Sequence, residues 1–185
     1  MKRTWYISDT HFSHKNIIKY CNRPYFNIDQ MNESMIANWN AVVRPDDEVF
    51  HLGDVAMGNR RLLPEYVKRL NGRIILIQGN HDYTAGLADV FHQVHQRVVT
   101  LTPHGSVELV HNPIHVQGGE DYAFCGHVHD KWTVMTKGTV VPAYATKRRS
   151  EPEFVAPIDI YNVGVDVRGF RPRSFEEIVF GDERP

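Results

Sequence analysis

The sequence predicts an α/β protein in which helices cover a mostly parallel sheet, and three observations lead to this prediction. Short apolar runs at Thr4–Ser8, Glu48–Leu52 and 74–77 have the length and composition of buried strands. Two segments with helical spacing of apolar residues lie between them. The chain has 185 residues, 42% hydrophobic and 23% charged, so residues 1–185 are expected to form one domain with a full core.

The first half of the chain is predicted to alternate strand, helix, strand, helix and strand. The segment Asn27–Val43 predicts the first helix, in which Asp29 can serve as N-cap. Its apolar residues recur on one helical face, at Met31, Met35, Trp39 and Val42. The segment Leu62–Leu70 predicts a shorter helix, with Pro64 tolerated in its first turn.

The second half is richer in strand-like segments. Five β-branched or aromatic runs are separated by turn residues, at Val94–Leu101, Val107–Val110, Tyr122–Cys125, Thr139–Val141 and Ile158–Val167. Residues 142–157 carry three prolines and the basic triplet Lys147-Arg148-Arg149, which predicts an exposed loop. Ser174 followed by Glu176-Glu177 predicts a final helical turn.

The composition narrows the possible functions. A net charge of −1 disfavours a broad surface for nucleic acid, although a local basic groove stays open. Cys21 and Cys125 do not form a disulfide framework, the N-terminus turns polar too soon for a signal peptide, and no apolar run reaches membrane-spanning length. We therefore expect a cytoplasmic protein without membrane contact, and no protein partner can be inferred. The 11 histidines beside only two cysteines favour metal sites made of imidazole and carboxylate.

Polar side chains follow five of the predicted strands, at the end where α/β sheets bind ligands. They are Asp9 and His11, Asp54, Asn80-His81-Asp82, His111, and His127 and His129. Any one of them alone is more typical of a turn or of a hydrogen-bonded core residue. Residues two apart in an extended chain point the same way, so each pair separated by one residue can reach one cluster. Seven candidate donors with one carboxylate able to bridge suit two metal ions, the arrangement that hydrolyses phosphate esters.

These motifs resemble the five motifs of the calcineurin-like metallophosphoesterase superfamily, in the same order, over residues 9–129. The whole sequence is most similar to the small single-domain members of bacteria and phages, as are the stretches Thr10–Ile17 and Asn162–Asp166. The resemblance implies a two-sheet β sandwich flanked by helices, in four α/β/β/α layers. It also implies two ion sites, one formed by Asp9, His11, Asp54 and His129 and the other by Asp54, Asn80, His111 and His127. His81 would face the substrate.

We accordingly expect a dinuclear metal-dependent phosphoesterase, in which a hydroxide bridging two divalent ions attacks phosphorus and His81 acts as general acid. Asp82 would either hold the His81 ring and raise its pKa or simply face solvent. Manganese is the metal that the resemblance favours, while iron, zinc, nickel and magnesium also suit mixed nitrogen and oxygen ligands.

The expected substrate is a small phosphodiester, nucleotide-like or otherwise. Two divalent ions, two carboxylates and one hydroxide leave a charge of about +1, which matches a diester anion better than a monoester dianion. The arginine motif of the superfamily's protein phosphatases is replaced here by residues 53–59, and their Glu by Asp82. His14 and Arg23 follow the first motif and either rim the substrate pocket or belong to a solvated helix surface. A phosphomonoesterase, a nuclease and a non-catalytic metal-binding scaffold are the alternatives.

Overall fold

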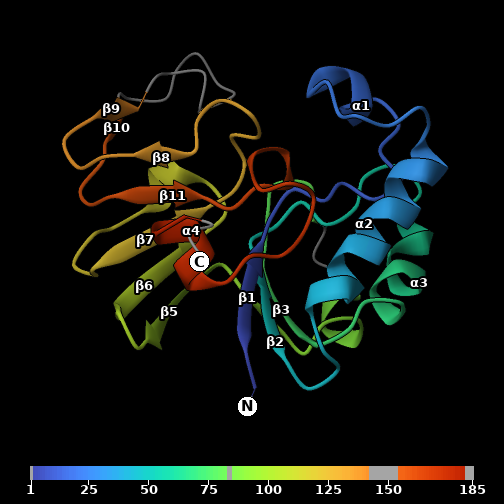
Figure 1. Ribbon diagram of the computed structural model, residues 1–185, viewed down its shortest axis with the longest axis horizontal. Coiled ribbons are helices and arrows are strands. Elements are labelled where there is room, and N and C mark those ends of the chain that lie inside the picture. Colours follow the sequence, from blue (N-terminus) through green and yellow to red (C-terminus); the bar gives the residue numbers. More distant parts are fainter. Residues whose placement is uncertain (1, 83–84, 142–153, 182–185) are drawn as a thin grey trace.

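The computed structural model describes residues 2–82, 85–141 and 154–181. The expected loop at 142–157 therefore lies mostly outside the described residues. Two β-sheets stand side by side, and three helices cover the far face of the first one (Figure 1). This arrangement confirms the expected two-sheet sandwich flanked by helices.

The first sheet is parallel, and its strands are in the order β1-β2-β3-β4. Its strands are β1 (Thr4–Ile7), β2 (Glu48–His51), β3 (Arg73–Ile77) and β4 (Gln93–His95). Ile7 pairs with His51 and His51 with Leu76, so the first three strands end at the same level. The polar motifs that follow these strands therefore leave the sheet at one edge.

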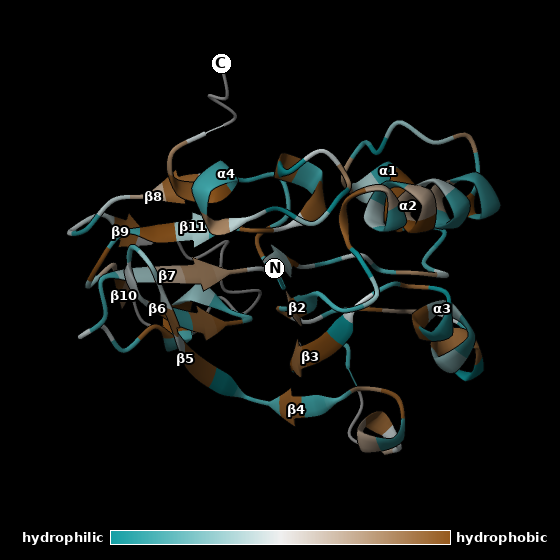
Figure 2. Ribbon diagram, turned by 60° about the horizontal axis from the view of Figure 1, so that its bottom comes forward, coloured by the Kyte–Doolittle hydropathy of each residue, from teal (hydrophilic) through white to brown (hydrophobic). Residues whose placement is uncertain are grey.

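Strands β1, β2 and β3 of this sheet are largely buried, whereas the edge strand β4 is partly exposed. Alternate residues of β1 face opposite ways: Ile7 joins the core under the helices, and Tyr6 joins the core between the sheets. In β3 the same alternation places Leu76 under the helices and Ile77 between the sheets. Figure 2 shows β3 as a largely hydrophobic strand.

The helices over the first sheet are α1 (Ile17–Tyr20), α2 (Ile28–Val42) and α3 (Leu63–Lys68), the last preceded by a 3₁₀ turn, η1 (Arg60–Leu62). Helix α2 buries the predicted face, with Met31, Met35 and Trp39 all inaccessible. Its N-cap is Asn27 rather than Asp29: the Asn27 side chain accepts a hydrogen bond of 2.8 Å from the Gln30 amide. Helix α1 has four residues, too few to give a recognisable periodicity in the sequence.

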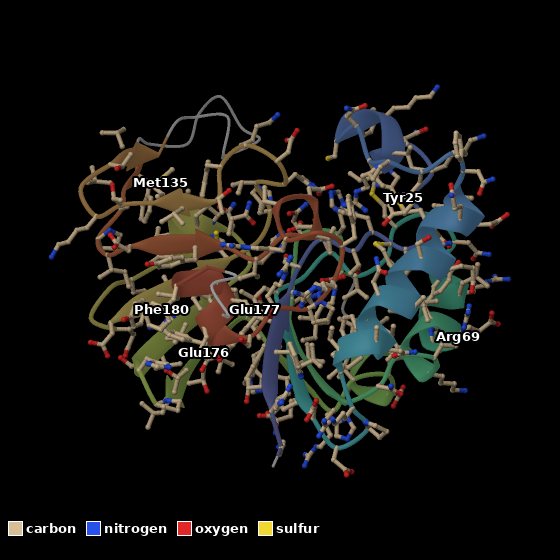
Figure 3. All side chains as sticks on the ribbon, in the orientation of Figure 1. Tyr25, Arg69, Met135, Glu176, Glu177 and Phe180 are labelled. Atoms are coloured by element: carbon tan, nitrogen blue, oxygen red, sulfur yellow. The ribbon has the colours of Figure 1, made fainter. Side chains whose placement is uncertain are left out.

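The second sheet is mixed, and its strands are in the order β5-β6-β7-β11-β8. They are β5 (Arg97–Thr102), β6 (Gly105–Val110), β7 (Tyr122–Cys125), β11 (Ile160–Asn162) and β8 (Val134–Met135). A two-stranded ribbon adds β9 (Val140–Val141) and β10 (Phe154–Val155). In Figure 3, Met135 lies on the side of this sheet and Arg69 on the opposite side, with the helices.

Two predicted strands differ from the structure. The run Val94–Leu101 divides at Gln96, so that β4 belongs to the first sheet and β5 to the second. The run Ile158–Val167 is a strand only over Ile160–Asn162 and then forms a 3₁₀ turn, η5 (Val165–Val167). Two further 3₁₀ turns are η2 (Leu87–Asp89) and η3 (Pro113–His115).

The final helical turn is confirmed as α4 (Phe175–Val179). Ser174 and Glu177 form a reciprocal capping box at its start. Phe175 and Ile178 join the core between the sheets, so this helix fastens the two sheets together. Among the described residues, no helix has both the length and the apolar character needed to cross a bilayer.

Candidate metal centre

The motif residues from five strand ends meet at one edge of the two sheets. The segments after β1, β2 and β3 come from the first sheet, and those after β6 and β7 come from the second. Seven of the predicted residues contribute oxygen or nitrogen atoms to this edge: Asp9, His11, Asp54, Asn80, His111, His127 and His129. They form two neighbouring groups.

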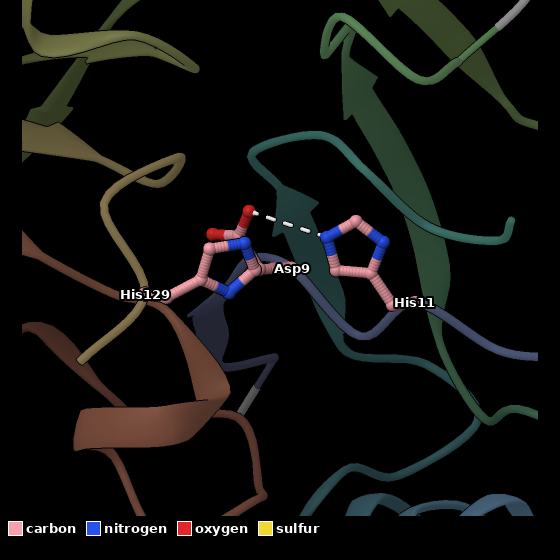
Figure 4. Close-up of side chains that lie close together, drawn as sticks. All are labelled: Asp9, His11 and His129. Carbon is pink, nitrogen blue, oxygen red and sulfur yellow. Dashed lines mark ion pairs between the residues drawn. The ribbon is translucent and has the colours of Figure 1, made fainter. Parts of the chain in front are cut away.

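The first group consists of Asp9, His11 and His129, which offer ligand atoms within 4.8 Å of one another (Figure 4). Asp9 Oδ1 lies 3.9 Å from His11 Nε2, and the rings of His11 and His129 are stacked with centroids 5.1 Å apart. Asp9 and His11 are buried, and the His129 side chain is 13% exposed. A cation bound here would meet one carboxylate and two imidazoles.

The second group consists of Asp54, His111 and His127, again within 4.8 Å of one another. Asn80 completes it, since its Oδ1 atom lies 3.1 Å from His111 Nε2 and 2.9 Å from His127 Nδ1. Its amide oxygen thus points at the same space as the two imidazole nitrogens.

Asp54 lies between the two groups. Its Oδ2 atom is 3.6 Å from His11 Nε2 and 3.5 Å from His111 Nε2. One carboxylate oxygen therefore stands close to a donor of each group. A carboxylate in this position can contribute to both groups.

The hydrogen bonds of the two carboxylates test whether the site fits metal ions. Asp9 Oδ2 accepts hydrogen bonds from Ser8 Oγ (2.7 Å) and the His127 amide (2.9 Å), and Asp54 Oδ1 accepts one from the His81 amide (2.8 Å). Among the described residues, the other oxygens, Asp9 Oδ1 and Asp54 Oδ2, are buried without a hydrogen-bond partner, as are both ring nitrogens of His11. Buried polar atoms are rarely left unpaired, so this donor set fits cations that the protein itself does not supply.

The backbone at these positions is strained. Five of the candidate ligands have a left-handed φ between 50° and 72°, which L-residues rarely adopt: Asp9, His11, Asp54, His127 and His129. The neighbouring glycines allow the segments to approach closely. A Cβ on Gly126 would lie 2.6 Å from Asp9 Oδ2, and one on Gly53 would lie 2.6 Å from the Gly79 backbone. The strand exits therefore leave no room for a side chain at Gly53 or Gly126.

Two histidines are held in one tautomer by acceptors that carry no proton. His111 Nδ1 donates to the Leu52 carbonyl at 2.7 Å, and His129 Nδ1 donates to Asp166 Oδ2 at 2.9 Å. A carbonyl and a carboxylate can only accept, so Nδ1 carries the proton and Nε2 keeps a free lone pair in each neutral ring. Outer hydrogen bonds of this kind orient metal-binding imidazoles.

Asp166 and Arg23 form a buried ion pair behind the first group, with side chains 2% and 0% exposed. Arg23 Nε and Nη2 donate to Asp166 at 2.8 and 3.0 Å. Its Nη1 and Nη2 also donate to the carbonyls of Thr10 and Asp9, at 2.9 and 2.8 Å. The expectation that Arg23 rims the pocket or lies on a solvated surface is therefore wrong. Its guanidinium is buried and donates hydrogen bonds to Asp166 and to two backbone carbonyls. His14, in contrast, does line the cavity beside the site.

Asp82 is buried and bonded to backbone, so it does not face solvent. Its Oδ2 atom accepts hydrogen bonds from the amides of Asp54 (2.7 Å) and Gly79 (2.9 Å), and Oδ1 accepts one from Val55 (3.0 Å). Asp82 as a residue is 8% exposed. Its carboxylate joins the exit of β2 to the exit of β3. It supports the polypeptide around Asp54.

His81 lies at the boundary between the metal centre and solvent. Its side chain is 23% exposed, and its Nε2 atom is 4.0 Å from Asp54 Oδ2. It lines a cavity of about 440 Å³ together with His14 and with His11, His127 and His129 of the metal centre. A larger cavity of about 620 Å³ lies between α2 and α4 and shares no residue with this site.

Burial and neighbouring charges set the protonation of the centre. Burial raises the pKa of Asp54 to about 6 and holds the pKa of His11 well below its usual value. Burial also acts to raise the pKa of Asp9, but the nearby imidazoles of His129, His111 and His11 outweigh it and the pKa is lowered. For His129, burial lowers the pKa, yet the Asp166 hydrogen bond and the Asp9 charge raise it to about 10. A cation at the first group would therefore have to displace a proton from His129.

His51 shows that not every buried histidine belongs to the centre. Its Nε2 atom is 3.0 Å from Thr10 Oγ1, and its ring stacks on Trp39 at 6.3 Å. Burial lowers the pKa of His51 to about 4. A neutral core histidine is the result.

The sequence reasoning missed the residues that support the ligands. Asp166 and Ser8 bond to His129 and Asp9, and Asn162 Nδ2 donates to the His129 carbonyl at 2.7 Å. Asn162 and Asp166 lie in the stretch Asn162–Asp166, which is similar to that of the small superfamily members. This similarity was the one signal from which their importance could have been predicted. Arg23 and Asp166 are 143 residues apart, and nothing local marks them as partners.

Comparisons with known proteins show the family and the fold of the chain. The calcineurin-like phosphoesterase superfamily domain matches residues 3–145. The uncharacterized protein MJ1445 of Methanocaldococcus jannaschii is 35% identical over 183 residues, which cover 97% of this chain and 90% of that protein. The Gene 66 protein of Mycobacterium phage L5 is 32% identical over 85 residues, 44% of this chain and 41% of that protein. A solved structure, the protein of unknown function AQ665 of Aquifex aeolicus, has a TM-score of 0.70 at 24% identity and covers 96% of this chain and 98% of its own, a likeness of fold alone.

Proposed function

Because this chain belongs to the calcineurin-like phosphoesterase superfamily, we propose that it is a hydrolase that cleaves small phosphodiesters at a centre for two metal ions. The observation that carries the proposal is the position of Asp54, with its unpaired Oδ2 within 3.6 Å of a donor from each ligand group. Packing of Tyr6 and Ile77 against the second sheet supports one domain over the whole chain.

Asp9, His11, Asp54 and His129 would hold one ion, and Asp54, Asn80, His111 and His127 the other. Divalent ions there would supply Lewis acidity, which makes water a nucleophile near neutral pH and neutralises charge on phosphoryl oxygens. Manganese and a cytoplasmic location stay predictions.

His81 would act on the leaving group. Its ring stands at the cavity wall while its backbone amide is fixed to Asp54 Oδ1, so its position relative to the bridging carboxylate is set by the turn itself. A protonated His81 can donate to the oxygen that departs from phosphorus. Since Asp82 is committed to three backbone amides, its contribution is to keep this turn in place.

The charge around the centre supports a diester. Arg23, the arginine nearest to the first motif, is buried in its pair with Asp166 and is not available to a second phosphate charge. Of the residues that line the cavity within the described part of the chain, Lys131 is the one lysine or arginine, and it is 3.3 Å from Asp130. A monoanion therefore suits the cavity better than a dianion.

The test compares bis(p-nitrophenyl) phosphate with p-nitrophenyl phosphate after the metal-stripped protein has been reloaded with Mn²⁺, Zn²⁺, Mg²⁺, Ni²⁺ or Fe²⁺. We expect a higher kcat/KM for the diester with at least one metal and complete loss of turnover in excess chelator. Faster monoester cleavage with every metal would refute the diester assignment. Full metal loading with no turnover on either ester would favour a binding scaffold.

A further inference from the structure

The cavity beside the metal centre has two chemically different walls. One is formed by the imidazoles of the centre, and the other is mainly apolar. The second wall combines Ile17 and Tyr20 of α1 with Cys21, Met57 and Val128. The volume of about 440 Å³ is in the range that holds a small organic molecule, well beyond what one phosphate group fills.

Tyr20 is the exposed part of this apolar wall. Its residue exposure is 70%, whereas Ile17, one turn earlier on the same helix, is 3% exposed and anchors α1 in the core. The helix is thus fixed while the aromatic ring faces the cavity. Large aromatic side chains that stay accessible beside a polar site can bind planar groups by stacking.

A series of rings connects Tyr20 to the metal centre. The His14 ring lies 5.4 Å from that of His11 and 6.1 Å from that of Tyr20, by ring centroids. Tyr20 is therefore the second ring beyond His11, and it offers a flat surface to a group that extends outward from a phosphate at the centre. The charged residues at the wall, Asp130 and Lys131, are paired with each other at 3.3 Å and leave the aromatic surface uncharged.

We propose that α1 forms a subsite for a planar, apolar ester arm, an aryl or heteroaryl group that stacks on Tyr20. Preferred substrates are phosphodiesters that carry such an arm beside the bond to be cleaved. This inference rests on the proposed phosphodiesterase function and specifies its substrate class. Phe26 supplies a matched control, because it is a second aromatic residue of the same region, 96% exposed, that does not line the cavity.

The experiment uses two diesters with the same leaving group, phenyl p-nitrophenyl phosphate and methyl p-nitrophenyl phosphate, on the manganese-loaded protein. For each ester, kcat/KM of a variant is divided by that of the wild type, so the different intrinsic reactivity of the two esters cancels. We expect Tyr20→Ala to lower this ratio about tenfold for the phenyl ester and less than twofold for the methyl ester. Tyr20→Phe should retain the phenyl ester activity, and Phe26→Ala should leave both ratios unchanged.

Equal losses on both esters, or no loss on either, would overturn the subsite while leaving the phosphodiesterase function intact. If the wild type cleaves neither ester with any of the five metals, the proposed function fails, and binding measurements then decide whether the subsite exists. In that case calorimetry with phenylphosphonate and methylphosphonate on the manganese-loaded protein should show tighter binding of the phenyl compound, lost in Tyr20→Ala. Equal affinities would overturn the subsite as well.

Discussion

Asp166→Asn removes one negative charge from the buried pair behind the metal centre and keeps the shape of the side chain. Arg23 would remain fully buried with its guanidinium facing an amide instead of a carboxylate. Removing one partner of a buried ion pair costs about 3–5 kcal/mol of folding free energy. Because Asn keeps one acceptor oxygen for Arg23 or for His129, we expect the lower end, about 3 kcal/mol.

The same substitution should weaken one metal ion selectively. His129 Nδ1 would lose its carboxylate acceptor at 2.9 Å, whereas His111 Nδ1 would keep its bond of 2.7 Å to the Leu52 carbonyl. Loss of an outer hydrogen bond of this kind reduces metal affinity by about 10–100-fold. We therefore expect one of two binding steps to weaken by this factor and the other to stay near its wild-type affinity.

Urea unfolding of the metal-free protein measures the first effect, and calorimetric titration with Mn²⁺ measures the second. Asp121→Asn is the matched control, since Asp121 is an exposed carboxylate that accepts from the Ser106 amide (2.8 Å) and hydroxyl (2.9 Å), away from the centre. A destabilised Asp166→Asn protein with two unaltered metal affinities would show that Asp166 serves the fold alone. Unaltered stability would refute the reasoning about the ion pair.

Three further predictions follow from the site and its surroundings. His81→Ala should keep the wild-type metal stoichiometry and lower turnover by about 10²–10⁴-fold on a diester with a poor, alkyl leaving group; equal turnover would remove His81 from the reaction. Asp82→Ala should lose at least about 3 kcal/mol in urea unfolding, because three buried amides lose a charged acceptor; wild-type stability would contradict this. Because burial lowers the pKa of His51 from 6.5 to about 4, its contribution to stability is present above pH 6.5 and is lost as the pH falls towards 4. His51→Gln should therefore reduce the fall in unfolding free energy over that range by roughly 3 kcal/mol, and an unchanged slope would argue that His51 is not the group that titrates.

The strand ends were predictable because their signal is local. In β3, apolar residues on both faces and an abrupt change to Gly79-Asn80-His81 mark a buried strand and its exit within one short stretch. Parallel strands in register then bring exits of this kind together whatever the connecting helices contain. The metal-ligand candidates therefore depend on strand order and on little else.

The supporting contacts were not predictable, since they join segments that are distant in sequence. Asp166 meets Arg23 only because η5 folds back beside the first strand exit, where the Val165 amide bonds to the Ser8 carbonyl at 3.1 Å. The division of the run Val94–Leu101 between two sheets could not be predicted for a related reason. No glycine or proline marks Gln96, and a β-branched segment looks the same whichever sheet it pairs with.

The left-handed backbone of the candidate ligands has a consequence for stability. The residues are Asp9, His11, Asp54, His127 and His129. At each such position glycine would relieve about 1 kcal/mol of strain, and at Asp54 it would also remove a buried charge. The same substitution would also remove oxygens that hold backbone amides, since Asp9 accepts a hydrogen bond from the His127 amide and Asp54 accepts one from the His81 amide. The strain at these positions and the contacts of their side chains therefore act on stability in opposite directions, and the unfolding free energy of a glycine variant measures which of the two is larger.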